Sequence, residues 1–206
     1  ETVFEQNIAK GRLLGTQVHN VQVLTNHADG HVLSDAEVAE FYLRAHDFGM
    51  RHGVTPCFEV HVNMWSEHFG RVEKVAALVQ SRGVPFRMTL DHSHVIFKID
   101  NPEEQKVQDM KADVDSGAVI LDPAKPDNVS KRWIDAGFVH HAHARAAIPA
   151  NPVNIWAKHP DGRFGRGIQN SKSSFRSVVC LGFGTIPVPF PQNIDDIAQI
   201  RGLLAL

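Results

Sequence analysis

The sequence has 206 residues, of which 43% are hydrophobic and 21% are charged, an ordinary globular balance that excludes a disordered chain or a coiled coil. A formal net charge of −2 disfavours a general nucleic-acid-binding protein, and no apolar run approaches the roughly 18 residues of a membrane span. The two cysteines provide neither a disulfide framework nor a thiolate zinc site, so we expect a protein of the reducing cytoplasm.

Strands and helices alternate along the first half of the chain. Residues 1–14 are expected to be the end of a helix, and the β-rich run 18–24 is the first predicted strand. Ser34 is followed three residues later by Glu37, and this capping box predicts a helix that begins there and ends at Gly53. The next predicted elements are a strand at 57–64, a helix at 71–80 and a strand at 84–90.

The second half of the chain begins with a polar stretch, residues 101–126, that has weak helical character near 102–111. The segment 129–133 precedes a predicted strand at 137–147, which is followed by a short element at 154–157, a strand at 178–181 and a helix at 195–204. The segment 171–206 is assigned only as a strand and a helix. The Gly-rich run 162–167 precedes no clear helix, so a dinucleotide site is not expected.

The alternation of strands and helices at intervals of about 30 residues indicates βαβ units and a parallel sheet. Polar residues follow the ends of successive strands, which is where barrel active sites are built. We therefore expect an α/β fold of the (β/α)8 TIM-barrel type, forming a single partial-barrel domain over residues 1–206.

The first candidate site is the predicted strand that contains Glu59 and His61. These two side chains share one face, because side chains alternate along a strand. A carboxylate within a buried strand is costly unless it is paired or bound to a cation. The alternative interpretation is that Glu59 is solvated or salt-bridged near the strand end.

The second candidate site is Asp91, which closes an apolar strand, with His94 three residues later. A carboxylate and an imidazole at the end of a strand can share a divalent ion or hold a hydroxylated substrate. The alternative makes Asp91 a helix N-cap or turn residue and His94 a surface histidine.

The third candidate site is the strand that carries His141, His143 and Arg145 on one side. A core strand of a parallel sheet normally consists of Val, Ile and Leu, so this pattern is unusual. Structural histidines that donate to backbone carbonyls are the alternative. Carboxylates with few imidazoles and no thiolate favour Mn²⁺, Mg²⁺ or Co²⁺, and Zn²⁺ also accepts such ligands.

These motifs resemble the xylose-isomerase-like TIM barrels, a family of sugar and sugar-phosphate isomerases and epimerases. The resemblance covers about residues 15–170 and rests on Glu59, the pair of Asp91 and His94, His143 with His141, and the GRG turn at 165–167. It implies one divalent metal ion held by Glu59, Asp91 and His143, and a sugar-like polyhydroxy carbonyl substrate that changes by proton transfer through an enediolate.

The same resemblance implies roles for the remaining candidate residues. Glu59 would also be the catalytic base, with His94 as its partner in catalysis, and Arg145, His61 and His141 would bind the substrate.

The sequence departs from the family pattern at two places. The family's first two strands would lie before residue 1, and the candidate eighth strand, residues 177–184, has no acid. We therefore expect an incomplete barrel, whose open edges favour a homo-oligomer. The alternatives are an apurinic-site endonuclease, with His159 as a further ligand, and a barrel that binds a sugar without converting it.

Overall fold

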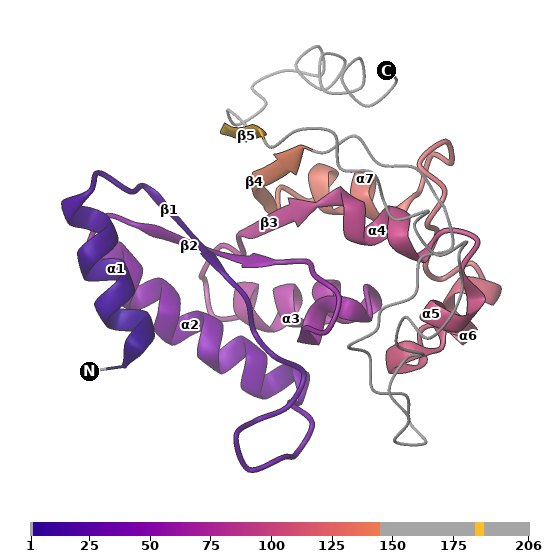
Figure 1. Ribbon diagram of the computed structural model, residues 1–206, viewed down its shortest axis with the longest axis horizontal. Helices are drawn as coiled ribbons and strands as arrows, with labels where there is room; N and C mark the ends of the chain where they lie inside the picture. Colours follow the sequence, from indigo (N-terminus) through magenta and orange to yellow (C-terminus); the bar gives the residue numbers. More distant parts are fainter. Residues whose placement is uncertain (1, 145–183, 188–206) are drawn as a thin grey trace, which may run out of the picture.

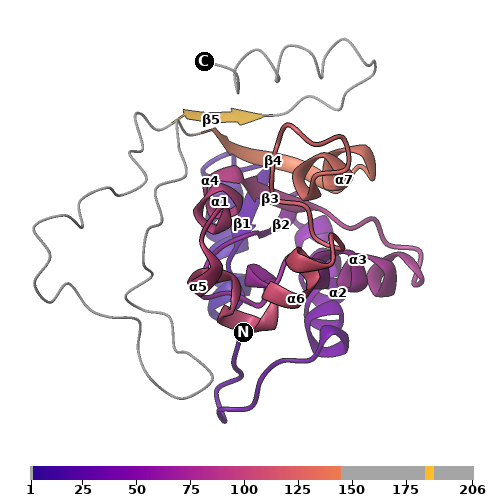
Figure 2. The ribbon, with the colours of Figure 1, turned by 90° about the vertical axis from the view of Figure 1, so that its right-hand side faces the viewer.

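Five strands form one sheet in the order β1-β2-β3-β4-β5 (Figure 1). The strands are β1 (Val18–Val21), β2 (Thr55–Glu59), β3 (Met88–Asp91), β4 (Val139–Ala144) and β5 (Gly184–Pro187). The first four are parallel, and β5 pairs with β4 in the antiparallel direction, as the turned view in Figure 2 shows. The computed structural model describes residues 2–144 and 184–187, and within them the sheet is open. An α/β fold with a parallel sheet is confirmed; a closed barrel is not seen in this part of the chain.

The strands are connected by helices of very different length. The helices of the described residues are α1 (Val3–Leu13), α2 (Asp35–Arg51), α3 (Gly70–Gln80), α4 (His92–Lys98), α5 (Pro102–Gln105), α6 (Lys111–Asp115) and α7 (Val129–Asp135), with 3-10 helices η1 (Trp65–Glu67) and η2 (Val107–Asp109). The predicted helix at 71–80 is confirmed as α3, and the segment 129–133 lies within the helix α7. None of these helices combines the length and the apolar character needed to cross a membrane. The elements predicted at 154–157, 178–181 and 195–204 lie outside the described residues.

Capping boxes set the beginnings of the first two helices. The Ser34 hydroxyl accepts a hydrogen bond from the backbone N–H of Glu37 at 3.3 Å, and the Glu37 carboxylate accepts one from the Ser34 N–H at 2.9 Å, as predicted. Thr2 and Glu5 make the same pair of bonds, so α1 begins at Val3. The expectation that this segment is only the end of a helix is wrong.

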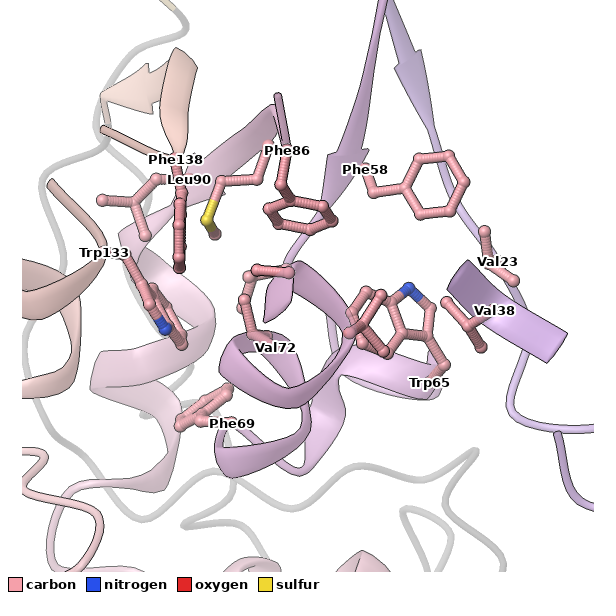
Figure 3. Packing of buried hydrophobic residues seen from close by; sticks show 14 of the residues in the cluster. Val23, Val38, Phe58, Trp65, Phe69, Val72, Phe86, Leu90, Trp133 and Phe138 are labelled. Carbon is pink, nitrogen blue, oxygen red and sulfur yellow. The ribbon is translucent and has the colours of Figure 1, made fainter. Parts of the chain in front are cut away.

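The hydrophobic core fills the space between the sheet and the helices α2, α3 and α7. α2 and α3 lie side by side below the sheet in Figure 1. The buried side chains that meet there are aromatic and β-branched (Figure 3). The Tyr42 ring of α2 lies 4.9 Å from the ring centroid of Phe58, on β2, and 4.9 Å from that of Phe86, just before β3. This packing rigidly supports the strands that carry the polar residues described below.

Strand β2 ends earlier than the sequence pattern predicts. It stops at Glu59, whereas the alternation of apolar residues continues to residue 64. The His61 N–H donates to the Ser66 hydroxyl at 3.2 Å rather than to a neighbouring strand, and Asn63 has a φ of 68°. His61 is therefore part of a turn, and the expectation that it shares a strand face with Glu59 is wrong.

Helix α4 has no counterpart among the predicted elements. It begins directly after β3, because the Asp91 carboxylate accepts a hydrogen bond from the Ser93 N–H at 3.1 Å and so caps the helix. The strand predicted at 84–90 begins later than expected, at Met88. β5 was not predicted either, and it lies beyond the strand expected at 178–181.

Candidate metal centre

Three neighbouring strands bring acidic and imidazole side chains to one edge of the sheet. Glu59 is the last residue of β2, Asp91 is the last residue of β3, and His143 is near the end of β4. Asp91 is directly opposite His143 in the register of β3 and β4. Because the strands are parallel, their carboxyl ends meet at the same edge, so the sequence positions alone bring these groups together.

The Glu59, Asp91 and His143 side chains converge on a common point. His143 Nδ1 lies 3.1 Å from Glu59 Oε1 and 3.4 Å from Asp91 Oδ2. The carboxylates are buried, with side chains 2% and 0% exposed, whereas the imidazole is 23% exposed. The predicted grouping of these three residues therefore agrees with the geometry. The Glu59 and Asp91 carboxylates are both removed from water and both lie next to His143 Nδ1. Two such carboxylates repel each other unless a positive charge lies between them.

The donor atoms fit a divalent cation. His143 Nδ1 is buried and makes no hydrogen bond within the described residues, although it faces both carboxylates. The ligand atoms of Glu59, Asp91 and His94 lie within 4.8 Å of one another, so His94 is an alternative third ligand. Carboxylate oxygens with one imidazole nitrogen suit Mn²⁺, Mg²⁺ or Co²⁺, and the absence of thiolate from the cluster makes softer ions less favourable.

Two amides that the sequence reading missed hold Glu59 in place. Asn20 Nδ2 donates to Glu59 Oε2 at 2.8 Å, and Gln22 Nε2 donates to the same oxygen at 2.7 Å. This leaves Glu59 Oε1 directed at His143. The signal that could have found them is their period-two spacing, which places both amides on one face of the strand next to β2.

Asp91 caps α4 with one carboxylate oxygen and faces the cluster with the other. Its Oδ1 accepts from the Ser93 N–H at 3.1 Å and from the Ser93 hydroxyl at 2.6 Å, so that Oδ2 faces the cluster. The N-cap interpretation and the site interpretation of this residue are thus compatible.

His94 is oriented by the turn that follows β2. The Val62 N–H donates to His94 Nδ1 at 3.5 Å, and His94 Nε2 lies 3.7 Å from Asp91 Oδ2. His94 Nε2 therefore faces the same carboxylate oxygen as His143 Nδ1, and His94 is a second imidazole that could complete the set of ligands. The His94 side chain is 14% exposed, so the surface interpretation is wrong.

The remaining predicted residues lie at the border of this cluster. The His61 ring centroid is 3.9 Å from that of His94, so the turn brings the residue to the site although it is not on the strand. His141 lies on the same face as His143, with its Nδ1 3.4 Å from the Thr89 hydroxyl, and burial lowers its pKa. Arg145 lies outside the described residues.

A buried ion pair stabilises the turn that follows β2. Lys98 Nζ, on α4, donates to Glu67 Oε1 at 2.6 Å and to the backbone carbonyl of Glu104 at 2.7 Å. Glu67 Oε2 in turn accepts from the Asn63 N–H at 2.7 Å. The pair thereby connects α4 to the turn that carries His61. Sequence reasoning did not identify it, because neither residue is in a recognisable motif.

Comparisons with protein-family models, with curated proteins and with solved structures found no match.

Proposed function

We propose that the chain is a divalent-metal-dependent isomerase or epimerase that acts on a sugar or a sugar-like polyhydroxy carbonyl. The observation that carries this proposal is the convergence of Glu59 and Asp91 on His143 Nδ1 at the carboxyl ends of three parallel strands. The resemblance of the same residues to the xylose-isomerase-like barrels supports it, and so does the parallel sheet, which suits an incomplete (β/α)8 barrel.

Glu59, Asp91 and His143 would hold the ion. A bound divalent ion would polarise a substrate carbonyl and stabilise the negative charge that develops on its oxygen. Two or more neighbouring oxygens of a polyol suit an ion whose remaining coordination positions are open to ligands. The 23% exposure of His143 indicates that this side of the cluster is reachable.

Glu59 would act as the base. It would take a proton from the carbon next to the carbonyl; the electron pair of that C–H bond would form a C=C bond while the π pair of the C=O bond moves to the oxygen, and the reverse shift would return the proton to one of the two carbons. Asn20 and Gln22 both donate to Oε2 and so fix the orientation of the carboxylate. His94 would donate to a substrate oxygen, and His61 and His141 would contact substrate hydroxyls.

The first test is metal content. The purified chain, equilibrated with Mn²⁺ and dialysed, should retain about one ion per chain, which is the stoichiometry that one cluster implies. Glu59→Gln, Asp91→Asn and His143→Ala should each lose it. His140→Ala is the matched control, because His140 neighbours His141 on β4 but points to the other face. Retention of the ion by all three variants would overturn the proposed centre.

The second test separates conversion from binding. Solvent deuterium should be incorporated into one member of a panel of ketoses and ketose phosphates by the metal-loaded chain, and Glu59→Gln should abolish the incorporation. Binding of a sugar without deuterium incorporation would instead indicate a binding protein. Metal-dependent cleavage of abasic DNA would indicate an endonuclease.

A further inference from the structure

A second group of metal-ligand side chains lies on the hairpin between β1 and α2, far along the chain from the cluster described above. This loop projects at the bottom of Figure 1. The hairpin is ordered by its own backbone: the His27 N–H donates to the His31 carbonyl at 2.9 Å, and the Gly30 N–H donates to the His27 carbonyl at 2.9 Å. Gly30 takes a φ of 96°, which a side chain disfavours. The turn therefore holds the two histidines on its opposite arms.

The three side chains of the sequence H-x-D-x-H point to one place. His31 Nδ1 lies 2.6 Å from Asp29 Oδ1, and His27 Nδ1 lies 3.2 Å from the same oxygen. The two imidazole rings stack with centroids 4.9 Å apart and an interplanar angle of 24°. The three ligand atoms all lie within 4.8 Å of one another, a separation that one ion can bridge.

Glu37 provides the outer partner that a metal-bound imidazole usually has. His31 Nε2 lies 2.9 Å from Glu37 Oε1. Glu37 Oε2 is itself fixed, because it accepts from the Ser34 N–H at 2.9 Å and from the Ser34 hydroxyl at 2.7 Å. A ligating histidine commonly donates its other ring nitrogen to a carboxylate, which sets its tautomer and orientation. With Nε2 directed at Glu37, Nδ1 is the nitrogen that faces Asp29.

We propose that His27, Asp29 and His31 form a second metal site that binds Zn²⁺, with Glu37 as the orienting partner of His31. Two imidazole nitrogens and one carboxylate oxygen match the ligand preference of Zn²⁺, Co²⁺ and Ni²⁺ and not that of Mg²⁺ or Ca²⁺. The side chains are 54%, 62% and 44% exposed, so a fourth position remains open to water. The site is independent of the proposed sugar chemistry, because it shares no residue with the first cluster.

The test is a calorimetric titration of the metal-free chain, without a histidine tag, with ZnCl2. His27→Ala/His31→Ala should lose one Zn²⁺ equivalent relative to the native chain, and Glu59→Gln/Asp91→Asn should retain that equivalent. Glu37→Gln should weaken it by about tenfold. His52→Ala, which removes a histidine after α2, should bind as the native chain does. MgCl2 should give no signal that depends on His27 and His31.

Two outcomes would overturn the proposal. One is an unchanged Zn²⁺ isotherm for His27→Ala/His31→Ala, which would show that any binding is adventitious and elsewhere. The other is loss of all Zn²⁺ binding in Glu59→Gln/Asp91→Asn, which would place it at the first cluster. If the first cluster binds no metal, the native chain should still bind one equivalent of Zn²⁺ at His27, Asp29 and His31. The two proposals can therefore fail separately. Circular dichroism of each variant checks that the exposed substitutions leave the fold intact.

Discussion

His143 Nδ1 lies 3.1 Å from Glu59 Oε1, although β3 separates the strands to which they belong. Adjacent strands are about 4.8 Å apart, so the two side chains have to lean toward each other across the intervening strand. Asp91 ends that strand, and its Oδ2 lies 3.4 Å from the same nitrogen. Three neighbouring strands therefore contribute one ligand-type group each to a single point.

The amides of Asn20 and Gln22 should tune the affinity of this centre. Asn20→Ala and Gln22→Ala each remove one hydrogen bond to Glu59 Oε2 and leave the carboxylate less well oriented. Each substitution should weaken Mn²⁺ binding by about tenfold, as measured by calorimetry. Gln17→Ala, an exposed glutamine just before β1, is the matched control and should bind as the native chain does. Equal affinities for all four proteins would show that the amides do not orient a ligand.

The buried pair of Lys98 and Glu67 should contribute far more to stability than an exposed pair of the same length. The Lys98–Glu67 and Lys106–Glu103 contacts are both 2.6 Å, but the first pair is 0% and 1% exposed and the second 54% and 72%. Lys98→Met leaves a carboxylate buried without its cation and should cost about 3–5 kcal/mol of the free energy of unfolding. Lys106→Met should cost less than about 1 kcal/mol. Urea unfolding measures both, and similar small costs would contradict the argument.

Gly49, in the last turn of α2, should not tolerate a side chain. A Cβ atom there would lie 2.5 Å from the Val54 carbonyl oxygen and 2.7 Å from the Pro56 ring. Alanine gains about 1 kcal/mol of helix propensity, but the overlap with backbone outweighs it, so Gly49→Ala should lower stability by about 1–3 kcal/mol. Gly11→Ala in α1 is the control, since its Cβ would lie 3.4 Å from Thr16. In thermal unfolding, the midpoint temperature of Gly11→Ala should be higher than that of the native chain, and that of Gly49→Ala should be lower.

The sequence allowed the local features of the fold to be predicted better than its turns. The start of α2 followed from Ser34 and Glu37 because a capping box involves only neighbouring residues. The end of β2 could not be predicted in this way, because the Ser66 hydroxyl that accepts the hydrogen bond from the His61 N–H belongs to the next element. The positive φ of Asn63 is a conformation that asparagine tolerates, but the residue type alone does not require it.

The same contrast holds for the candidate centre. Glu59, Asp91 and His143 are grouped through the family resemblance, because the predicted strand at 57–64 does not end at Glu59, whereas the observed strand β2 does. Asn20 and Gln22 could not be assigned to Glu59, since their role depends on which strand lies beside β2.

Acidification should destabilise the chain through its partly buried histidines. Burial is the largest cause of a lowered pKa at His19, His46, His68, His140 and His141. The unfolded chain, with ordinary histidine pKa values near 6.5, then binds protons at a higher pH than the folded chain does. The contribution of these groups to stability is therefore complete above about pH 6.5 and falls as the pH falls below it.

His68 is the residue with which to test this dependence. Burial lowers its pKa, and Asp113, whose Oδ2 lies 3.4 Å from His68 Nε2, opposes that effect only in part. In EDTA, the native chain should lose stability between about pH 7.5 and 5.5, and His68→Gln should lose less over the same interval. His52→Gln, at a histidine whose ring centroid lies 4.6 Å from that of Phe48, serves as the comparison. Urea unfolding at both pH values supplies the slopes, and a native slope in His68→Gln would contradict the assignment.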